Sequence, residues 1–292
     1  DKAALNNFAF PNSVMGMFLT AAAGGPNVEA NPAYNDFFAR FDASGATVSP
    51  LGQFIGSGGS FFMAWLGFSD FVAYSARGGD TTQAPKPDAT VLAGYYEQAL
   101  GGMLTNNPVW KGVVGTVPDI LALPYFQFIA STVAKPSGII PLHPTDDAAT
   151  IGLLQTLATG FNSTLAGLSQ QGFLSADEAA ARQLSWSAGA NAVLINDESL
   201  TDLGPLWDGL VGASLMDAPT RAQLEPYRLA RMATDNDILP LAAQQVLGVA
   251  VTPTVVWGVT APLTDEYVLT ASELYEFEVA RATVNGAIKT AV

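Results

Sequence analysis

The apolar and polar positions of residues 60–79 outline a strand, a turn and a helix. Large apolar side chains fill residues 61–66 and stop at Gly67, a polar turn reaches Asp70, and a segment suited to a helix ends at a pair of glycines. A short unbroken apolar run is typical of a strand that is buried within a parallel sheet. Because ligands bind at the carboxyl ends of such strands, the turn at 67–70 is the first candidate site.

The elements that follow favour the same architecture. Residues 89–106 place apolar side chains at helical spacing and predict an amphipathic helix. Residues 110–117 are rich in residues with high β-propensity and predict the next parallel strand, which Pro118 and Asp119 end. Strand, helix and strand in this order favour a doubly wound α/β sheet.

Between about residues 120 and 270 the pattern changes to Pro-rich loops, helices and short strands. Ser175 and Glu178 predict a capping box at one helix start, and Thr270 and Glu273 predict another at the start of the final helix. The other predicted elements are helices over 146–171 and 220–232 and strands over 191–196 and 249–259. We therefore expect one α/β domain over residues 1–292, with an insertion or cap at about 120–270.

The composition of the chain excludes some classes of partner and some kinds of site. The chain carries 26 acidic and 12 basic residues, for a net charge of −14, which argues against nucleic acid as a partner. It has no cysteine, so disulfides and thiolate metal sites are excluded. We see no signal peptide at its start and no apolar stretch long enough to span a membrane. The high apolar content, 49%, indicates a generous core, or else a surface that a partner covers.

Few residues suit metal or nucleophilic chemistry. His143 is the only histidine and lies in a loop between prolines, so a zinc site would lack the ligands it needs. Residues 235–237 resemble the first half of a calcium loop, but the glycine and the glutamate that such a loop requires are missing. A helix N-cap cluster is the alternative for these residues. We expect no cofactor and no metal.

Taken in order, several segments resemble the SGNH/GDSL-type hydrolases, and most closely their surface-lipoprotein branch in Bacteroidota. The segments are NNFAFPNS (6–13), NPAYNDFFARF (31–41), FFMAWLGFSDFVAYSARGG (61–79), GVVGTVPDILALPYF (112–126), NAVLINDES (191–199), RMATDNDILPLAA (231–243) and PLTDEYVLTASELYEF (262–277). The resemblance implies a three-layer α/β/α, flavodoxin-like fold. It also implies export to the cell surface or periplasm of a Gram-negative bacterium, with a lipid anchor outside this sequence.

The resemblance also implies site residues, at which the chain departs from the family. Asn12 stands where the family has an oxyanion-hole glycine, and Ser69 replaces the asparagine donor of the family's GxND block, here residues 67–70. Asn12, Gly67 and Ser69 are thus the oxyanion-hole-equivalent positions, and Phe68 and Asp70 are candidate pocket residues. The family's GDS block, with its nucleophilic serine, and its DxxH block, with its histidine, do not occur in this sequence.

These departures favour a non-catalytic protein that binds a partner protein, a glycan or an acyl ligand, alone or as a subunit of a cell-surface assembly. One alternative is a carboxylic-ester hydrolase with an acyl-enzyme mechanism, whose serine and histidine blocks lie outside the sequence. A weaker alternative is a carbohydrate-binding module that uses tyrosine and tryptophan side chains. The hydrolase requires Ser69 to line a pocket, whereas a partner subunit requires an apolar patch at the sheet edge or on the insertion.

Overall fold

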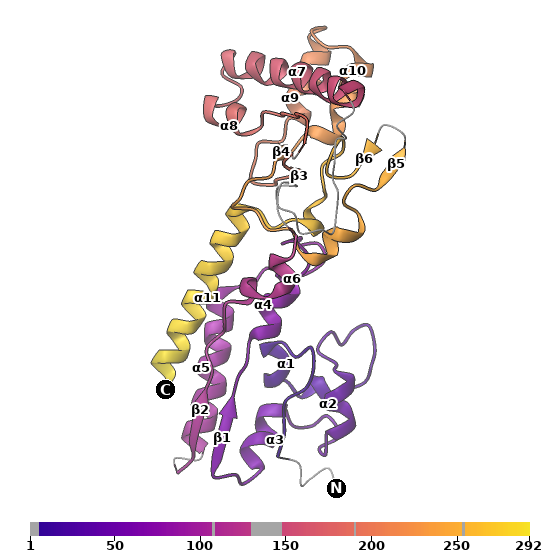
Figure 1. Ribbon diagram of the computed structural model, residues 1–292. Coiled ribbons are helices and arrows are strands. Elements are labelled where there is room, and N and C mark those ends of the chain that lie inside the picture. The colour runs from indigo at the N-terminus through magenta and orange to yellow at the C-terminus, as the bar shows by residue number, and fades with distance from the viewer. Residues whose placement is uncertain (1–5, 107–108, 130–147, 190, 253–254) are drawn as a thin grey trace. The chain divides into compact units, whose positions relative to one another are not determined.

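The computed structural model describes residues 6–106, 109–129, 148–189, 191–252 and 255–292, which belong to two compact units (Figure 1). The first unit comprises Asp1–Tyr74, Pro85–Ile120 and Tyr275–Val292, and the second comprises Ser75–Ala84 and Leu121–Leu274. His143 lies outside the described residues. A single domain over 1–292 with an insertion at about 120–270 stays a prediction.

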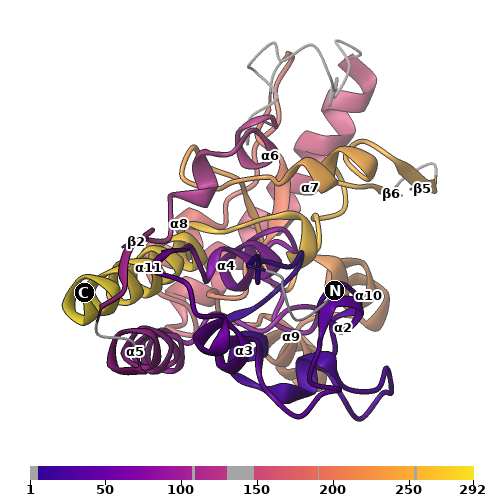
Figure 2. The ribbon, with the colours of Figure 1, turned by 90° about the horizontal axis from the view of Figure 1, so that it is seen from below.

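The first unit combines helices with a two-stranded parallel sheet, so the mixed α/β class is confirmed. The predicted helix over 89–106 is α5, and it connects the strand β1 to the strand β2. The helices α1, α3 and α5 pack against one another (Figures 1 and 2). The elements are α1 (Met15–Leu19), α2 (Asp36–Phe41), α3 (Pro50–Gly56), β1 (Phe61–Ala64), α4 (Phe68–Ser75), α5 (Ala89–Asn106), β2 (Lys111–Val114) and most of α11 (Ala271–Ala291).

The strand β1 is buried on one face only, which corrects the prediction of a fully buried strand. Phe62 lies inside, against Gly112 of β2, where a Cβ would come within 2.5 Å of its ring. On the opposite face Phe61 is 59% exposed, and Met63 is 80% exposed. The run is apolar because both sides of the strand carry apolar residues, although only one side faces the core. In so short a run, the hydrophobic pattern does not distinguish this case from a strand that is buried on both faces.

The second unit is mainly helical, with two short antiparallel pairs, β3–β4 and β5–β6. Residues 230–232 form a strand, so the predicted helix over 220–232 is wrong at its end. None of the described helices is long and apolar enough to cross a lipid bilayer. The elements are α6 (Pro124–Gln127), α7 (Ala148–Gln170), α8 (Ala176–Ala181), β3 (Leu194–Asn196), α9 (Gly204–Gly212), α10 (Ala218–Leu224), β4 (Ala230–Met232), β5 (Ala250–Thr252) and β6 (Val255–Val256).

A buried arginine explains why the chain turns to a strand at 230–232. The guanidinium of Arg231 bonds to Asp197 at 2.5 Å and makes two 2.7 Å bonds to the carboxylate of Asp237. Asp237 also accepts the backbone N–H groups of Thr234 and of Ala271, at the start of α11. Asp237 is therefore a buried ion-pair residue that also caps α11, rather than a free ligand for calcium. No helix begins at residues 235–237, so the alternative of a helix N-cap cluster there is wrong.

We expect Arg231→Met to lower the free energy of unfolding by about 3–5 kcal/mol, because it leaves two buried carboxylates without their cation. Urea unfolding followed by circular dichroism measures this. The control is Arg228→Met, which removes half-exposed pairs with Asp202 and Glu225 and should cost about 0–1 kcal/mol. Equal losses for the two variants would contradict the importance of the buried network.

Candidate functional site

The turn after β1 closes around Gly67. Its φ is +82°, in the left-handed region, and a Cβ there would lie 2.4 Å from the Oη of Tyr96. The Tyr96 hydroxyl donates a short hydrogen bond to the carbonyl oxygen of Leu66. Glycine alone satisfies both the backbone angle and the close approach. A side chain of α5 thus supports the turn at 67–70 from behind.

Asp70 joins this turn to α1. Its two carboxylate oxygens accept the backbone N–H of Met15 at 3.0 and 3.3 Å. Because α1 has no capping side chain at its own N-cap residue, Asp70 serves as its cap. Burial raises the pKa of Asp70 to about 6, since the N–H donors offset only part of the lost solvation. Burial, and then the charge of Asp70, raise the pKa of Tyr96.

Asn12 occupies a second left-handed position, with a φ of 57°. The side chain of Asn35 holds the adjoining turn by donating to the carbonyl oxygen of Pro11 at 2.9 Å. Glycine adopts this φ without cost, and asparagine tolerates it better than most residues. The backbone therefore accounts for an asparagine at a position where the resemblance expects glycine.

A cavity of about 300 Å³ lies beside the 67–70 turn. Gly67, Phe68 and Ser69 line it together with Ser13, which sequence reasoning missed although it directly follows Asn12. The structure thus brings three of the five predicted site residues together. The remaining lining is apolar: Phe8, Ala9, Phe10, Met15, Phe18, Trp65 and Leu66.

The residues that line the cavity determine which ligands it can bind and which reactions it can catalyse. The hydroxyls of Ser13 and Ser69 can donate or accept hydrogen bonds, and the aromatic walls favour an uncharged, largely apolar ligand. Asn12 and Asp70 do not line the cavity, and neither does any other ionisable side chain of the described residues. A serine hydroxyl acts as a nucleophile only with a base beside it, and such a base would have to come from outside this lining.

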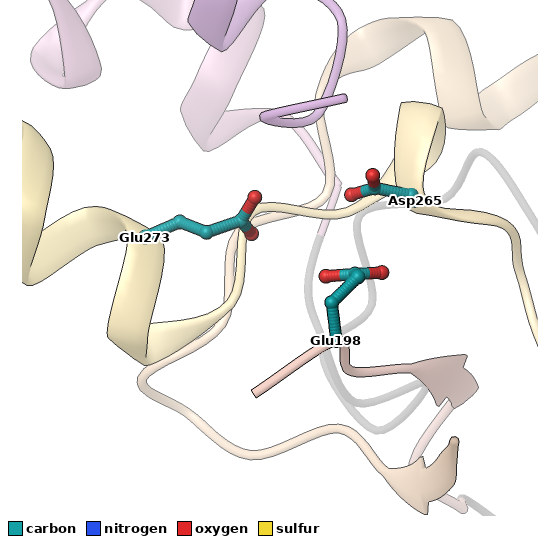
Figure 3. Close-up of side chains that lie close together, drawn as sticks. All are labelled: Glu198, Asp265 and Glu273. Carbon is teal, nitrogen blue, oxygen red and sulfur yellow. The ribbon is translucent and has the colours of Figure 1, made fainter. Parts of the chain in front are cut away.

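The second unit holds a separate cluster of carboxylates. Glu198 follows β3, Asp265 begins a 3₁₀ turn, and Glu273 lies in the first turn of α11. Figure 3 shows the three side chains converging, and one oxygen of each lies within 4.8 Å of the others. The Gly79 backbone approaches so closely that a Cβ there would lie 1.9 Å from an oxygen of Glu273.

Burial and mutual repulsion keep these carboxyls protonated to unusually high pH. Burial, followed by the charges of Glu198, Glu273 and Asp80, raises the pKa of Asp265 to about 8. Burial raises the pKa of Glu273 to about 7 and also raises the pKa of Glu198. Carboxyls at this spacing can share protons, and their oxygens are the ligand type that hard divalent cations take.

Sequence reasoning identified Glu273 only as a capping residue. The capping prediction is confirmed, because a Glu273 oxygen accepts both the N–H and the hydroxyl of Thr270 at 2.8 Å. Glu198 and Asp265 carry no spacing signal, since the segment after β3, a 3₁₀ turn and the start of α11 bring the carboxylates together. Comparisons with protein-family models, curated proteins and solved structures find no match for the chain.

We expect Asn12→Gly to change the free energy of unfolding by less than about 0.5 kcal/mol, whereas Asn12→Val should lower it by about 1–2 kcal/mol. The cause is the left-handed φ, which glycine adopts freely and valine does not. Chemical denaturation measures both variants. Asn27, an exposed asparagine without a positive φ, provides the control, and Asn27→Val should change stability little. A tolerated valine at position 12 would contradict the left-handed turn.

The carboxylate cluster makes stability depend on pH. A carboxyl whose pKa is raised by folding stabilises the fold while it is protonated, and this contribution is lost as the pH rises through its folded pKa. For Asp265 and Glu273 the loss falls between the ordinary values near 4 and about 7–8.

We expect the wild-type protein to lose about 1–3 kcal/mol more than Asp265→Asn between pH 5.5 and pH 9, an amount reduced by proton sharing and solvent screening. Urea unfolding at the two pH values measures this difference. Asp177→Asn, at an exposed position of α8 away from the cluster, should follow the wild type. A pH dependence unchanged in Asp265→Asn would show that the cluster does not titrate in this range.

Proposed function

We propose that this protein is a non-catalytic relative of the SGNH/GDSL-type hydrolases that binds an uncharged acyl or ester-type ligand. The observation that carries the proposal is the cavity in which Gly67, Phe68 and Ser69 lie beside Ser13. Gly67 and Ser69 are two of the three positions that the resemblance makes equivalent to the family's oxyanion hole, and the third, Asn12, does not line the cavity. The volume, the two hydroxyls and the aromatic walls suit a short acyl chain with one polar group.

The finer structural and cellular points belong to the same proposal. The three-layer α/β/α arrangement is supported by the order β1, α4, α5 and β2 and by the parallel pairing of the two strands. Export to the cell surface or periplasm of a Gram-negative bacterium rests on the resemblance alone. A role as a subunit of a surface assembly is supported by the exposed outer face of β1 and β2, where Trp65 is 66% and Val113 is 55% exposed.

The ester hydrolase is the second candidate, because Ser69 lines the cavity as that interpretation requires. It needs a base from outside the cavity lining, and in the family's scheme the nucleophilic serine as well, whereas the binding function needs only what the cavity holds. The binding protein and the hydrolase are therefore distinguished by whether the protein only binds an ester or also hydrolyses it.

We expect methyl hexanoate to bind saturably, with a change in tryptophan fluorescence that Trp65→Phe removes. Ser69→Ala should weaken binding about 3- to 10-fold, the effect of losing one neutral hydrogen bond. Ser60→Ala, at an exposed serine that does not line the cavity, is the matched control and should bind like the wild type. We expect no hydrolysis of 4-nitrophenyl butanoate above the rate in buffer.

Two results would overturn parts of this proposal. Absence of saturable binding, or equal binding by Ser69→Ala, would reject the cavity as the ligand site. Ester turnover that Ser69→Ala reduces and Ser60→Ala does not would replace the binding protein with the hydrolase.

A further inference from the structure

One edge of the β1–β2 sheet is open. The backbone N–H groups of Lys111 and Gly115 donate to the carbonyl oxygens of Ser60 and Ala64, at 3.2 and 2.8 Å. In a parallel pair, alternate residues of a strand bond to the same neighbour, so the peptide groups of Phe61 and Met63 point to the other edge. Among the described residues these groups have no hydrogen-bond partner.

A cavity of about 290 Å³ lies along this edge. Residues 6–9 line one side of it, and residues 61–66 line the other. Residues 6–9 make no backbone hydrogen bond to β1 within the described part of the chain. The cavity, which we call the edge slot, therefore separates two chain segments that face each other without pairing.

The edge slot is lined mainly by apolar side chains, with Asn6 and Asn7 as its polar members. Phe61 and Met63 contribute exposed apolar side chains to it, and Phe18, Phe54 and Met103 contribute to its lining. Although the chain carries 26 acidic and 12 basic residues, none of the described residues that line the slot is charged. The complementary occupant is thus an uncharged segment, and a second copy is disfavoured because each copy carries a net charge of −14.

We propose that the edge slot binds one extended, uncharged strand of a partner polypeptide. The strand pairs with the peptide groups of Phe61 and Met63 and extends the sheet, while its alternate apolar side chains cover the exposed side of β1. The slot shares Phe8, Ala9, Phe18, Trp65 and Leu66 with the Ser69 cavity, so one end of the bound strand reaches that cavity. The strand site overlaps the proposed acyl site at these shared residues, but it rests on the sheet edge and not on the acyl-binding function.

The test uses the whole protein and a capped synthetic heptapeptide of alternating threonine and valine. We expect saturating peptide to slow amide hydrogen exchange at Phe61 and Met63 by at least about tenfold. Gly112 and Val114, whose peptide groups face the outer edge of β2, are internal controls and should be unchanged. The same peptide with N-methyl groups on alternate amides keeps its side chains but cannot pair, and it should have no effect.

A blocking variant locates the site. Ala9 is exposed and lines the slot, so Ala9→Trp should fill it and abolish the protection. Ala282→Trp, at an exposed position of α11, should retain the protection. Exchange unaffected by peptide, an equal effect of the N-methylated peptide, or protection confined to Gly112 and Val114 would overturn the proposal. Protection that grows with protein concentration without peptide would assign the edge to a second copy, and would also overturn it.

Discussion

The first unit depends on how the chain leaves β1. Gly67 must adopt a left-handed φ and lie against Tyr96, whose hydroxyl holds the Leu66 carbonyl. Only with this turn in place can Asp70 accept the Met15 N–H and cap α1. One glycine, one tyrosine and one buried carboxylate therefore fix the relative positions of β1, α1, α4 and α5. The cavity lined by Ser13 and Ser69 follows from that arrangement.

The second unit contains two clusters of carboxylates, one buried and one partly exposed. Asp197 and Asp237 surround Arg231, whose charge and five donors compensate the cost of burial. Glu198, which is exposed, and the half-buried Asp265 and Glu273 gather without a cation in contact among the described side chains, and the raised pKa values of the three carboxyls favour protonation instead. The first cluster therefore stabilises the unit over a wide pH range, whereas the second makes stability sensitive to pH near neutrality.

Local signals predicted the elements that local interactions determine. The helix over 89–106 and the Thr270–Glu273 cap are found where periodicity and capping chemistry place them. The apolar run at 61–66 predicted a strand, but not which of its faces the core covers. The strand at 230–232 depends on the distant carboxylate of Asp197, and the cavity depends on Ser13 and Ser69 lining the same space. Such contacts join residues far apart in the sequence, so no local pattern encodes them.

The apolar composition of the chain had two explanations, a generous core or a covered surface. The first unit has a core built on Phe62, Phe71 and Tyr96, yet Phe61, Met63 and Trp65 remain exposed along the neighbouring edge. Exposed apolar side chains carry little cost when scattered, but here they coincide with peptide groups of β1 that have no hydrogen-bond partner among the described residues. Either feature alone would be ordinary in a small sheet. Their coincidence on one edge favours a surface that becomes fully satisfied only when another strand is bound.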